Sequence, residues 1–316
     1  MRVLCVGEML TDIIVRTVDS VDFLNDTKQV EEIEVRSGGD ANNNAIDLAV
    51  LGNDVTYLGR ISTDPLGDYL VSNAERYGID MRFIARSDTT QTKSLILINA
   101  KGDRTFLQTP GTSAEFCLED CRAEALEGQD ILQIGGAFHL PSFDGDGAAK
   151  LLCMAKERGI LTSMDITTDR SGRWKGILDP CYPYLDYFLP SIEQASKVSG
   201  KERPEEIAAY FLDRGVKNVA VKLGKDGSYF RNHETAFFAG CYDNLKVAET
   251  TGAGDAFCAG FLTGVGEGMD PEGCMTLGTA CSAFVIQEVG ATAGIRDLET
   301  VKQFIASRPP LRMEYC

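Results

Sequence analysis

Short runs rich in β-branched residues alternate with longer amphipathic segments along most of the chain. The runs have the length of strands, and the segments carry apolar residues at helical spacing. Strands are expected at Val3–Val6, Val55–Leu58, Ile131–Ile134, Leu161–Met164, Tyr187–Leu189 and Val219–Leu223. Helices are expected at Ala41–Leu51, Leu66–Tyr77, Ala148–Arg158, Pro204–Arg214 and Ala256–Gly266. This alternation predicts an α/β fold with a mostly parallel central sheet covered by helices on both faces.

Two regions depart from this rhythm and predict small antiparallel strands. Residues Asp12–Val18 with Glu31–Arg36, and Lys93–Asn99 with Arg104–Gln108, alternate apolar and polar positions. These strands, from about 12–36 and 93–108, are expected to form a small sheet inserted within the larger fold. Such a sheet can be a lid over the carboxyl ends of the parallel strands, where ligands of these folds bind, or a surface decoration or dimer surface. The pattern does not choose between them.

Length, charge and cysteine usage narrow the class of protein. The 316 residues suit a single domain, 1–316, with the small sheet inserted in it. Apolar residues make up 44%, and no stretch is apolar enough to predict a membrane span. The formal charge of −16 disfavours nucleic acid, which is bound by clustered Lys and Arg. Ten cysteines are scattered without CxxC pairs, which favours reduced thiols and a cytoplasmic location.

The most informative segment is a glycine turn, Thr250–Phe257, that precedes an apolar run with helical spacing. A helix N-terminus presents unpaired N–H groups and the positive end of its dipole, and glycine lets an anion approach the backbone. Asp255 has two interpretations: a first-turn acid that stabilises the helix by about 1 kcal/mol, or a general base beside an anion site. The chain contains no G-x-x-x-x-G-K-S/T, so a Walker-type loop is not the phosphate site.

This turn, Thr250-Thr251-Gly252-Ala253-Gly254-Asp255-Ala256-Phe257, resembles the signature D-T-T-G-A-G-D-x-F of the ribokinase family, the PfkB-type carbohydrate kinases. The resemblance implies a ribokinase-like three-layer sandwich with a β lid, and an ATP-dependent kinase that phosphorylates a sugar hydroxyl. It also implies that Asp255 is the catalytic base, that Gly252, Ala253 and Gly254 form the anion hole, and that Thr251 contributes to ATP binding. Glu249 replaces the usual first aspartate, which leaves a monovalent-cation site near it open.

Two N-terminal segments resemble the sugar-binding motifs of the same family. Gly38–Ala45 is similar to G-G-x-x-x-N-x-A, and Gly7–Asp12 is similar to G-E-x-x-x-D. In isolation they would be a capped helix start and a turn. The resemblance implies a sugar-binding set consisting of Asp12, Gly38, Gly39 and Asn43, with Asp40 as a further candidate. Polar side chains suit a polyol, because each hydroxyl that leaves water needs a protein partner.

Two further segments bear on the nucleotide and the metal. Val221–Gly227 resembles v-K-L-G-x-x-G, which implies that Lys222, Gly224 and Gly227 lie along ATP, although a surface hairpin gives the same pattern. The family's N-x-x-E is replaced by Ser191 and Gln194, and Glu193 is the remaining metal candidate by a shift of one residue. Mg²⁺ is expected because phosphoryl transfer requires the charge of the triphosphate to be neutralised.

The substrate is the least determined feature of the sequence. Asp165, Arg170 and Trp174 resemble the D-x-N-x-R-x-x-x-W stretch of fructokinase-like and ketodeoxygluconate-kinase-like members. Arg170 could bind a sugar acid or be a surface arginine. The stretch Arg104–Pro110 lacks the second arginine and the tyrosine of the ketodeoxygluconate branch, which favours a neutral sugar over a sugar acid.

Two other classes of function stay open, and so does the assembly. A nucleoside kinase of the same fold would keep every catalytic residue and change only the lid and the sugar pocket. A non-catalytic sugar- or nucleotide-sensing protein is the second, given Ser191, Gln194 and Glu249. The lid strands could pair two subunits into a homodimer.

Overall fold

Nine strands form the central sheet of the computed structural model, which describes residues 1–21, 23–24, 27–169 and 171–316. Their order is β15-β14-β13-β12-β11-β10-β9-β1-β4. The strands from β12 to β4 run parallel, whereas β13, β14 and β15 extend the sheet as antiparallel strands. The strands of this sheet are β1 (Arg2–Gly7), β4 (Asp54–Leu58), β9 (Ile131–Ala137), β10 (Leu161–Ile166), β11 (Tyr187–Phe188), β12 (Asn218–Lys222), β13 (Ser228–Arg231), β14 (Ala236–Ala239) and β15 (Met313–Tyr315).

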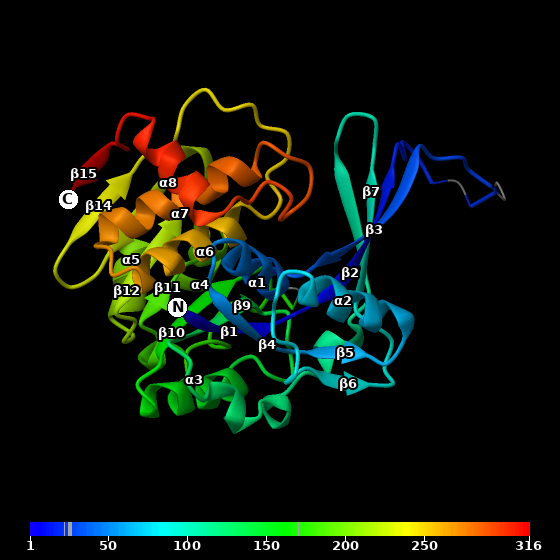
Figure 1. The fold of residues 1–316 in the computed structure, drawn as a ribbon, viewed down its shortest axis with the longest axis horizontal. Helices are drawn as coiled ribbons and strands as arrows, with labels where there is room; N and C mark the ends of the chain where they lie inside the picture. The colour runs from blue at the N-terminus through cyan, green and yellow to red at the C-terminus, as the bar shows by residue number, and fades with distance from the viewer. Residues whose placement is uncertain (22, 25–26, 170) are drawn as a thin grey trace.

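Helices cover both faces of this sheet (Figure 1). The α-helices are α1 (Asp40–Val50), α2 (Pro65–Glu75), α3 (Asp146–Glu157), α4 (Ile192–Ser199), α5 (Pro204–Leu212), α6 (Ala253–Gly266), α7 (Pro271–Val285) and α8 (Leu298–Ala306). The short 3-10 helices are η1 (Gly111–Ala114), η2 (Leu118–Asp120), η3 (Ala123–Leu126), η4 (Tyr182–Tyr184) and η5 (Gly224–Asp226). No helix within the described ranges is long and apolar enough to cross a membrane.

Alternation along the strands divides the core into two layers. On β1, Val3 and Cys5 point to the layer formed with α1, α6 and α7, whereas Leu4 and Val6 point to the layer formed with α3 and α5. All four side chains are fully buried. Because a parallel strand is covered on both faces, its sequence is a continuous apolar run, which is how the sequence predicted β1.

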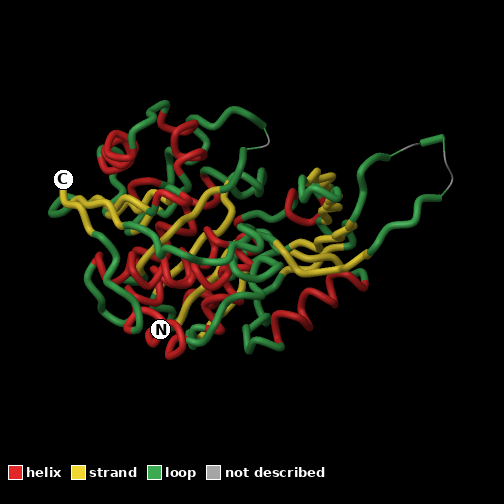
Figure 2. The backbone as a smooth tube through the Cα atoms, turned by 90° about the horizontal axis from the view of Figure 1, so that it is seen from above, coloured by secondary structure: helices red, strands yellow, loops and turns green. Residues whose placement is uncertain are grey.

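Two hairpins form a second, four-stranded sheet that projects from the side of the main body (Figures 1 and 2). Its strands, in spatial order, are β3 (Glu32–Gly38), β2 (Leu10–Arg16), β7 (Lys93–Ile98) and β8 (Arg104–Gln108). The outer pairs are antiparallel, and β2 and β7 join the hairpins by parallel pairing. We call these four strands the small sheet.

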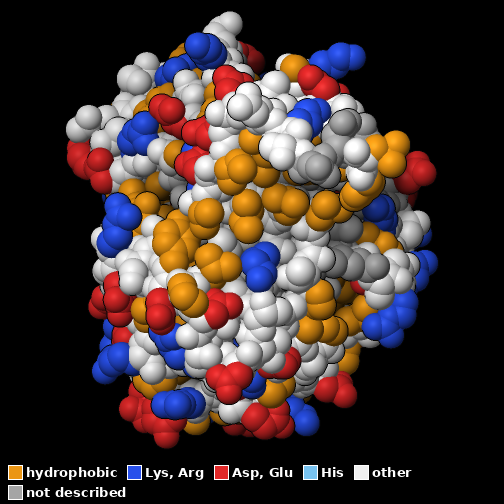
Figure 3. Space-filling view, turned by 90° about the vertical axis from the view of Figure 1, so that its right-hand side faces the viewer, with side chains coloured by type: hydrophobic (Ala, Val, Ile, Leu, Met, Phe, Trp, Pro, Cys, Tyr) orange, Lys and Arg blue, Asp and Glu red, His pale blue; other side chains and the backbone are white. Residues whose placement is uncertain are grey.

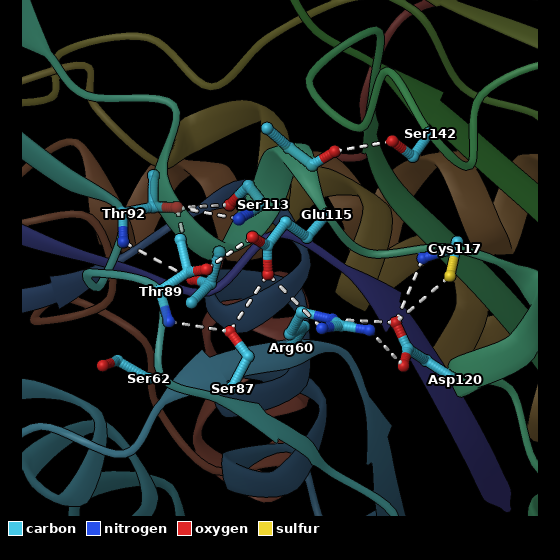
Figure 4. A network of polar contacts seen from close by, with 12 residues as sticks. Arg60, Ser62, Ser87, Thr89, Thr92, Ser113, Glu115, Cys117, Asp120 and Ser142 are labelled. Atoms are coloured by element: carbon cyan, nitrogen blue, oxygen red, sulfur yellow. Dashed lines mark hydrogen bonds and ion pairs between the residues drawn. The ribbon is translucent and has the colours of Figure 1, made fainter.

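A polar network anchors the small sheet to the body (Figure 4). Arg60, on β5 (Arg60–Ser62) beside β6 (Ala85–Ser87), donates to both carboxylate oxygens of Asp120 at 3.0 and 2.7 Å. Thr92, directly before β7, donates to Pro110 O at 2.8 Å. The chain entering β7 is therefore tied to the segment that follows β8.

The predicted fold class is confirmed: a three-layer, ribokinase-like α/β fold carries a small additional sheet. Each predicted helix and strand is present, with ends displaced by a few residues. Asp64 caps α2, since its carboxylate accepts hydrogen bonds from Leu66 N and Gly67 N. The antiparallel extension β13–β15 was not predicted.

Candidate active site

Asp255 lies in the first turn of α6, where two asparagines of α1 bind its carboxylate. Asn43 Nδ2 donates to Oδ2 at 2.9 Å, and Asn44 Nδ2 donates to Oδ1 at 3.2 Å. Gln133 Nε2, on β9, donates to the side-chain oxygen of Asn44 at 3.1 Å. All four side chains are buried. The orientation of the Asp255 carboxylate is therefore fixed by amide donors from a distant part of the chain.

The environment of Asp255 raises the pKa of its carboxyl well above the usual range. Burial is the main cause, and the neighbouring Asp40 carboxylate adds to it, as does Asp165. The hydrogen bond from Asn43 and the charge of Lys222 act in the opposite direction. A carboxylate whose pKa moves toward the working pH is a stronger general base, so Asp255 is suited to accept a proton from an alcohol.

Gly252, Ala253 and Gly254 form a tight turn at the N-terminus of α6. Gly252 is the N-cap residue with φ of 78°, and a β-carbon on it would collide with the carbonyl of Ala291. At Gly254 a β-carbon would lie 3.3 Å from Nζ of Lys222. The turn therefore leaves backbone N–H groups at the dipole-positive end of a 14-residue helix, which is a suitable anion site.

A cavity of about 520 Å³ opens beside this turn, and its volume suits a nucleotide-sized ligand. Lys222, Gly224 and Gly227 line it, as do Ala253 and Gly254 of the turn. Sequence reasoning missed Tyr242, Asn244 and Leu245, and the wall also includes Phe257, Thr279, Ser282, Ala283 and Ile286. The residues from α7 repeat at helical spacing, and that pattern does not distinguish a cavity wall from ordinary core.

Thr251, predicted to contribute to ATP binding, makes contacts with β8 of the small sheet and with Glu249. Its hydroxyl accepts from Arg104 Nη1 at 2.5 Å and donates to Glu249 Oε1 at 2.7 Å. Arg104 Nη1 also donates to Glu249 Oε1 at 2.7 Å, and Gly290 N donates to Oε2 at 2.9 Å. Glu249 therefore connects β8 of the small sheet to the glycine turn.

Asp12, Gly38 and Gly39 meet at the N-terminus of α1, one turn before Asn43. A β-carbon on Gly38 would collide with the Asp12 carboxylate. Gly39 is the N-cap residue of α1 with φ of 99°, and a β-carbon there would collide with the Glu8 carbonyl. The four residues predicted to bind a sugar thus lie together, and the two glycines are required by the close approach of their neighbours.

Acidic groups dominate this second region. Burial raises the pKa of Asp12 to about 7, with further contributions from Glu8 and Asp40. Glu8 is buried, and its Oε2 lies 2.9 Å from Nδ1 of His139. His139 also lines a cavity of about 240 Å³ with Phe138, Asp144, Asp169 and Arg173. Sequence reasoning missed both residues of the pair, although Glu8 stands within the G-E-x-x-x-D motif and His139 follows a strand end.

A buried ion pair lies between the two regions. Lys222 Nζ donates to Asp165 Oδ2 at 2.8 Å, and the side chains of both residues are largely buried. Burial lowers the pKa of the Lys222 ammonium, but Asp165, Cys258 and Asp255 together raise it by more, so the pKa lies above its ordinary value. The sequence marked Lys222 as a nucleotide contact and did not indicate this partner.

The residues near the predicted metal site are arranged as a helix cap. Ser191 Oγ accepts from Gln194 N at 3.4 Å, and Gln194 Oε1 accepts from Ser191 N at 3.3 Å, which is a capping box at the start of α4. Glu193 is exposed. Within the described part of the chain no group of three or more His, Cys, Asp or Glu side chains could hold a metal. These residues fit a Mg²⁺ ion bound mainly by nucleotide phosphates and water, with Glu193 as an outer contact.

Arg170, predicted to contact the substrate, lies outside the described residues. Its neighbour Asp169 accepts hydrogen bonds from Ser171 N and Trp174 N at 2.8 and 2.6 Å. The segment that follows β10 is thus folded onto the wall of the smaller cavity.

These contacts define the chemistry. A base that can remove a hydroxyl proton stands between a region of polar side chains and a turn that can stabilise phosphoryl charge, beside a cavity of nucleotide size. This combination is what transfer of a phosphoryl group from a nucleotide to a small alcohol requires.

Comparison with known proteins gives the family. Residues 1–298 match the model of the pfkB family carbohydrate kinases. An ATP-dependent 6-phosphofructokinase of Thermoanaerobacterium thermosaccharolyticum is 28% identical over 306 residues, covering 95% of this chain and 92% of that protein. A 2-dehydro-3-deoxygluconokinase of Bacillus subtilis is 26% identical, covering 90% and 92%. The crystal structure of a ribokinase from Thermotoga maritima superimposes with a TM-score of 0.82 at 26% identity, covering 96% and 99%.

The chain belongs to the pfkB family of carbohydrate kinases. It is an ATP-dependent sugar kinase.

Proposed function

We propose that Asp255 removes the proton from a sugar hydroxyl while the turn Gly252–Gly254 stabilises the phosphoryl group in transfer. The observation that carries this proposal is the Asp255 carboxylate, held by Asn43 at 2.9 Å beside the N-terminus of α6. ATP occupies the cavity of about 520 Å³, next to Lys222, Gly224 and Gly227. Thr251 follows the lining residue Thr250 and contributes to ATP binding. Asp12, Gly38, Gly39 and Asn43 bind the sugar, and Arg170 stays a substrate contact predicted from the sequence alone.

The reaction is an in-line displacement. The hydroxyl proton moves to Asp255, the sugar oxygen bonds to the γ-phosphorus, and the bond from that phosphorus to the β,γ-bridging oxygen breaks to release ADP. Mg²⁺ would neutralise the charge of the triphosphate and would be held mainly by phosphate oxygens and water, with Glu193 as the candidate side chain. The residues of the chain orient the hydroxyl, hold the proton and keep the phosphoryl charge near N–H donors.

The test is the substitution Asp255→Asn, measured by ADP release. Asn keeps the shape of the side chain and removes the base, so turnover should fall by about 10³-fold with sugar binding retained. Asp270→Asn is the matched control, because Asp270 is the N-cap of α7 and asparagine caps equally well. Turnover of the Asp255 variant within a few-fold of the parent protein would contradict the role of base.

The acceptor is a neutral sugar rather than a sugar acid or sugar phosphate. The side chains around the N-terminus of α1 are carboxylates and amides, namely Glu8, Asp12, Asp40 and Asn43. Hydroxyl groups can donate to them, whereas an anionic group placed there would be repelled.

A screen for ADP release separates the possible acceptors. The panel contains hexoses, pentoses, sugar acids, sugar phosphates and nucleosides. A neutral sugar with the highest kcat/KM is the expected result, and preference for an anionic sugar would reject the charge argument. Preference for a nucleoside would identify a nucleoside kinase of the same fold. Sugar-dependent melting shifts without ADP release would identify a sensing protein.

The small sheet serves as a lid and as the surface of a homodimer. The register places Ile13, Val35, Leu95 and Leu107 on one face of the small sheet, with Val15, Ile33 and Leu97 beside them. Ile33, Val35 and Leu107 are 65%, 45% and 54% exposed, and hydrophobic side chains gather on the side of the molecule that carries this sheet (Figure 3). An apolar sheet face of this kind suits a second copy of the chain.

Val35→Lys tests the dimer, with sedimentation equilibrium as the measurement. The parent protein should sediment as a dimer and the variant as a monomer, because burying an unpaired ammonium in an apolar interface is costly. Leu161→Lys, which changes a partly exposed residue at the start of β10, is the control. A monomeric parent protein would rule out this assembly.

Residues 1–316 act as one kinase unit in the cytoplasm. All ten cysteines are free thiols, which suits a reducing compartment. A monovalent cation near Glu249 is not required, because Arg104, Thr251 and Gly290 already donate to its carboxylate.

A further inference from the structure

The ammonium group of Lys222 is directed toward acceptor atoms of other residues. The ammonium has three donor hydrogens, and three acceptors surround it: Asp165 Oδ2 at 2.8 Å, Gly254 O at 3.5 Å and Cys258 Sγ at 3.5 Å. Cys258 Sγ in turn lies 3.5 Å from Asp165 Oδ2. The ammonium is thus held within a cluster at the base of α6, while Lys222 also contributes to the wall of the larger cavity.

Lys222 and its acceptors belong to three separate elements. Asp165 stands near the end of β10, Lys222 ends β12, and Gly254 and Cys258 belong to the first two turns of α6. The ion pair therefore bridges two central strands and reaches the carbonyl of the residue that precedes the base. Because Gly254 also belongs to the turn whose N–H groups face the phosphate, the position of Lys222 affects both the turn and Asp255.

The charges that face Asp255 come from every element packed around it. Asp40 lies on α1, Asp165 on β10, Lys222 on β12 and the Cys258 thiol on α6 itself. Glu8 and His139 act on Asp40 in turn. Among the described residues that act directly on Asp255, Lys222 is the cation, opposite the carboxylates of Asp40 and Asp165.

We propose that Asp165 is a positioning residue for phosphoryl transfer, which holds the Lys222 ammonium against Gly254 and Cys258. The ammonium then fixes the start of α6 and offsets the negative charge around Asp255. This inference rests on the proposed role of Asp255 as the base. It changes the interpretation of Lys222, from a residue that grips the nucleotide with its charge to one that orders the turn and supports the ionised base.

The pH dependence of kcat/KM tests this proposal, because the two members of the pair act on Asp255 with opposite sign. Asp165→Asn removes a negative charge, so the acidic limb of the profile should move to lower pH, by about one unit. Lys222→Met removes the positive charge, so the same limb should move to higher pH by a similar amount. Loss of packing alone would not move the two limbs in opposite directions.

A second readout separates positioning from nucleotide binding. If Lys222 orders the turn, Lys222→Met should lower kcat by about tenfold or more and change the KM for ATP by less than about threefold. A large increase in the KM for ATP with kcat unchanged would show that the ammonium binds the nucleotide, and would overturn the proposal.

Asp186→Asn is the matched control for the loss of a buried ion pair. Asp186 is buried, and its carboxylate accepts from Lys156 Nζ at 2.7 and 2.6 Å and pairs with Lys217 at 2.9 Å. Asp186 has no part in the proposed catalysis, so its variant should be less stable and keep the parent pH profile. If Lys222→Met does not fold, the double variant with Asp165→Asn replaces it, and its acidic limb should lie near that of the parent protein.

The outcomes test the positioning role of Asp165 separately from the role of Asp255 as the base. Limbs displaced in opposite directions support the role of Asp165, as does a double variant close to the parent profile. The positioning role is wrong if the acidic limbs of the two single variants move together or do not move. It is also wrong if the acidic limb of the double variant stays more than about one pH unit from that of the parent protein. Retained turnover in Asp255→Asn overturns the assignment of the base instead, so failure of the positioning role and failure of the proposed catalysis are distinguishable.

Discussion

Asp12→Asn should stabilise the protein at neutral pH while weakening sugar binding. The Asp12 carboxyl lies at the N-terminus of α1, and burial raises its pKa from an ordinary 3.8 to about 7, with Glu8 and Asp40 adding to the effect. The folded protein therefore binds this proton more tightly than the unfolded chain. The tighter binding of this proton stabilises the folded state below about pH 4, and this stabilisation is lost as the pH rises to about 7.

The size of the effect follows from the same values. Each pKa unit corresponds to about 1.4 kcal/mol, so the difference between 3.8 and about 7 corresponds to about 4 kcal/mol at most. Asp12 is not completely inaccessible to solvent, and screening reduces this to about 2 kcal/mol. At pH 8 the Asn variant should melt several degrees above the parent protein. The difference should shrink as the pH falls toward 4.5.

Differential scanning calorimetry between pH 4.5 and 8 measures this dependence. Asp64→Asn is the control: burial raises the pKa of Asp64, but hydrogen bonds from Gly67, Gln91, Ser62 and Leu66 lower it by more, so the pKa lies below its ordinary value. Neutralising Asp64 should therefore not stabilise the protein at pH 8. The KM for the sugar should rise by about tenfold or more in Asp12→Asn, because hydrogen bonds to a charged acceptor are lost. Equal melting temperatures for parent and Asp12 variant across the whole pH range would refute the reasoning.

Three further outcomes follow from contacts around the glycine turn. Arg104→Leu removes the link from β8 to Glu249 and Thr251. ATP hydrolysis without sugar should therefore rise relative to sugar phosphorylation. An unchanged ratio of the two rates would exclude a lid role for this contact. Replacing K⁺ by tetramethylammonium should change kcat by less than about twofold, since Glu249 already has its donors; strong activation by K⁺ would disprove this. Gly252→Ala should lower Tm, and it should lower kcat by about 10²-fold, because the new β-carbon would meet the Ala291 carbonyl. A variant with the Tm and kcat of the parent protein would show that the turn can shift without loss of stability or activity.

The parallel part of the main sheet could be predicted because its strands are buried on both faces. Val3–Val6 and Ile131–Ile134 are continuous apolar runs between amphipathic segments, and a single sequence carries that signal. Strands β13 and β14 have four residues each, and β15 has three. Such short segments become strands through pairing with one another, which local sequence does not encode.

The site shows the same division between local and distant signals. The glycine turn and Asp255 could be predicted because the turn, the helix start and the acid are adjacent in the sequence. The contacts of Asp255 with Asn43 and Asn44 span more than two hundred positions and depend on how α1 packs against α6. The capping box of Ser191 and Gln194 could be predicted, since S-x-x-Q before a helix is a known N-terminal pattern. The comparison with N-x-x-E instead directs attention to the metal at these two positions.

The bridge from α1 to α6 has a consequence for synthesis of the chain on the ribosome. Asn43 and Asn44 emerge early, whereas Asp255 emerges only after the whole parallel part of the sheet has been made. Until then the buried amides of α1 lack their carboxylate partner, and β1 and α1 lack the helical layer that covers them. In the mechanism proposed above, an incomplete nascent chain therefore lacks its base, and phosphoryl transfer begins only when α6 has docked on α1.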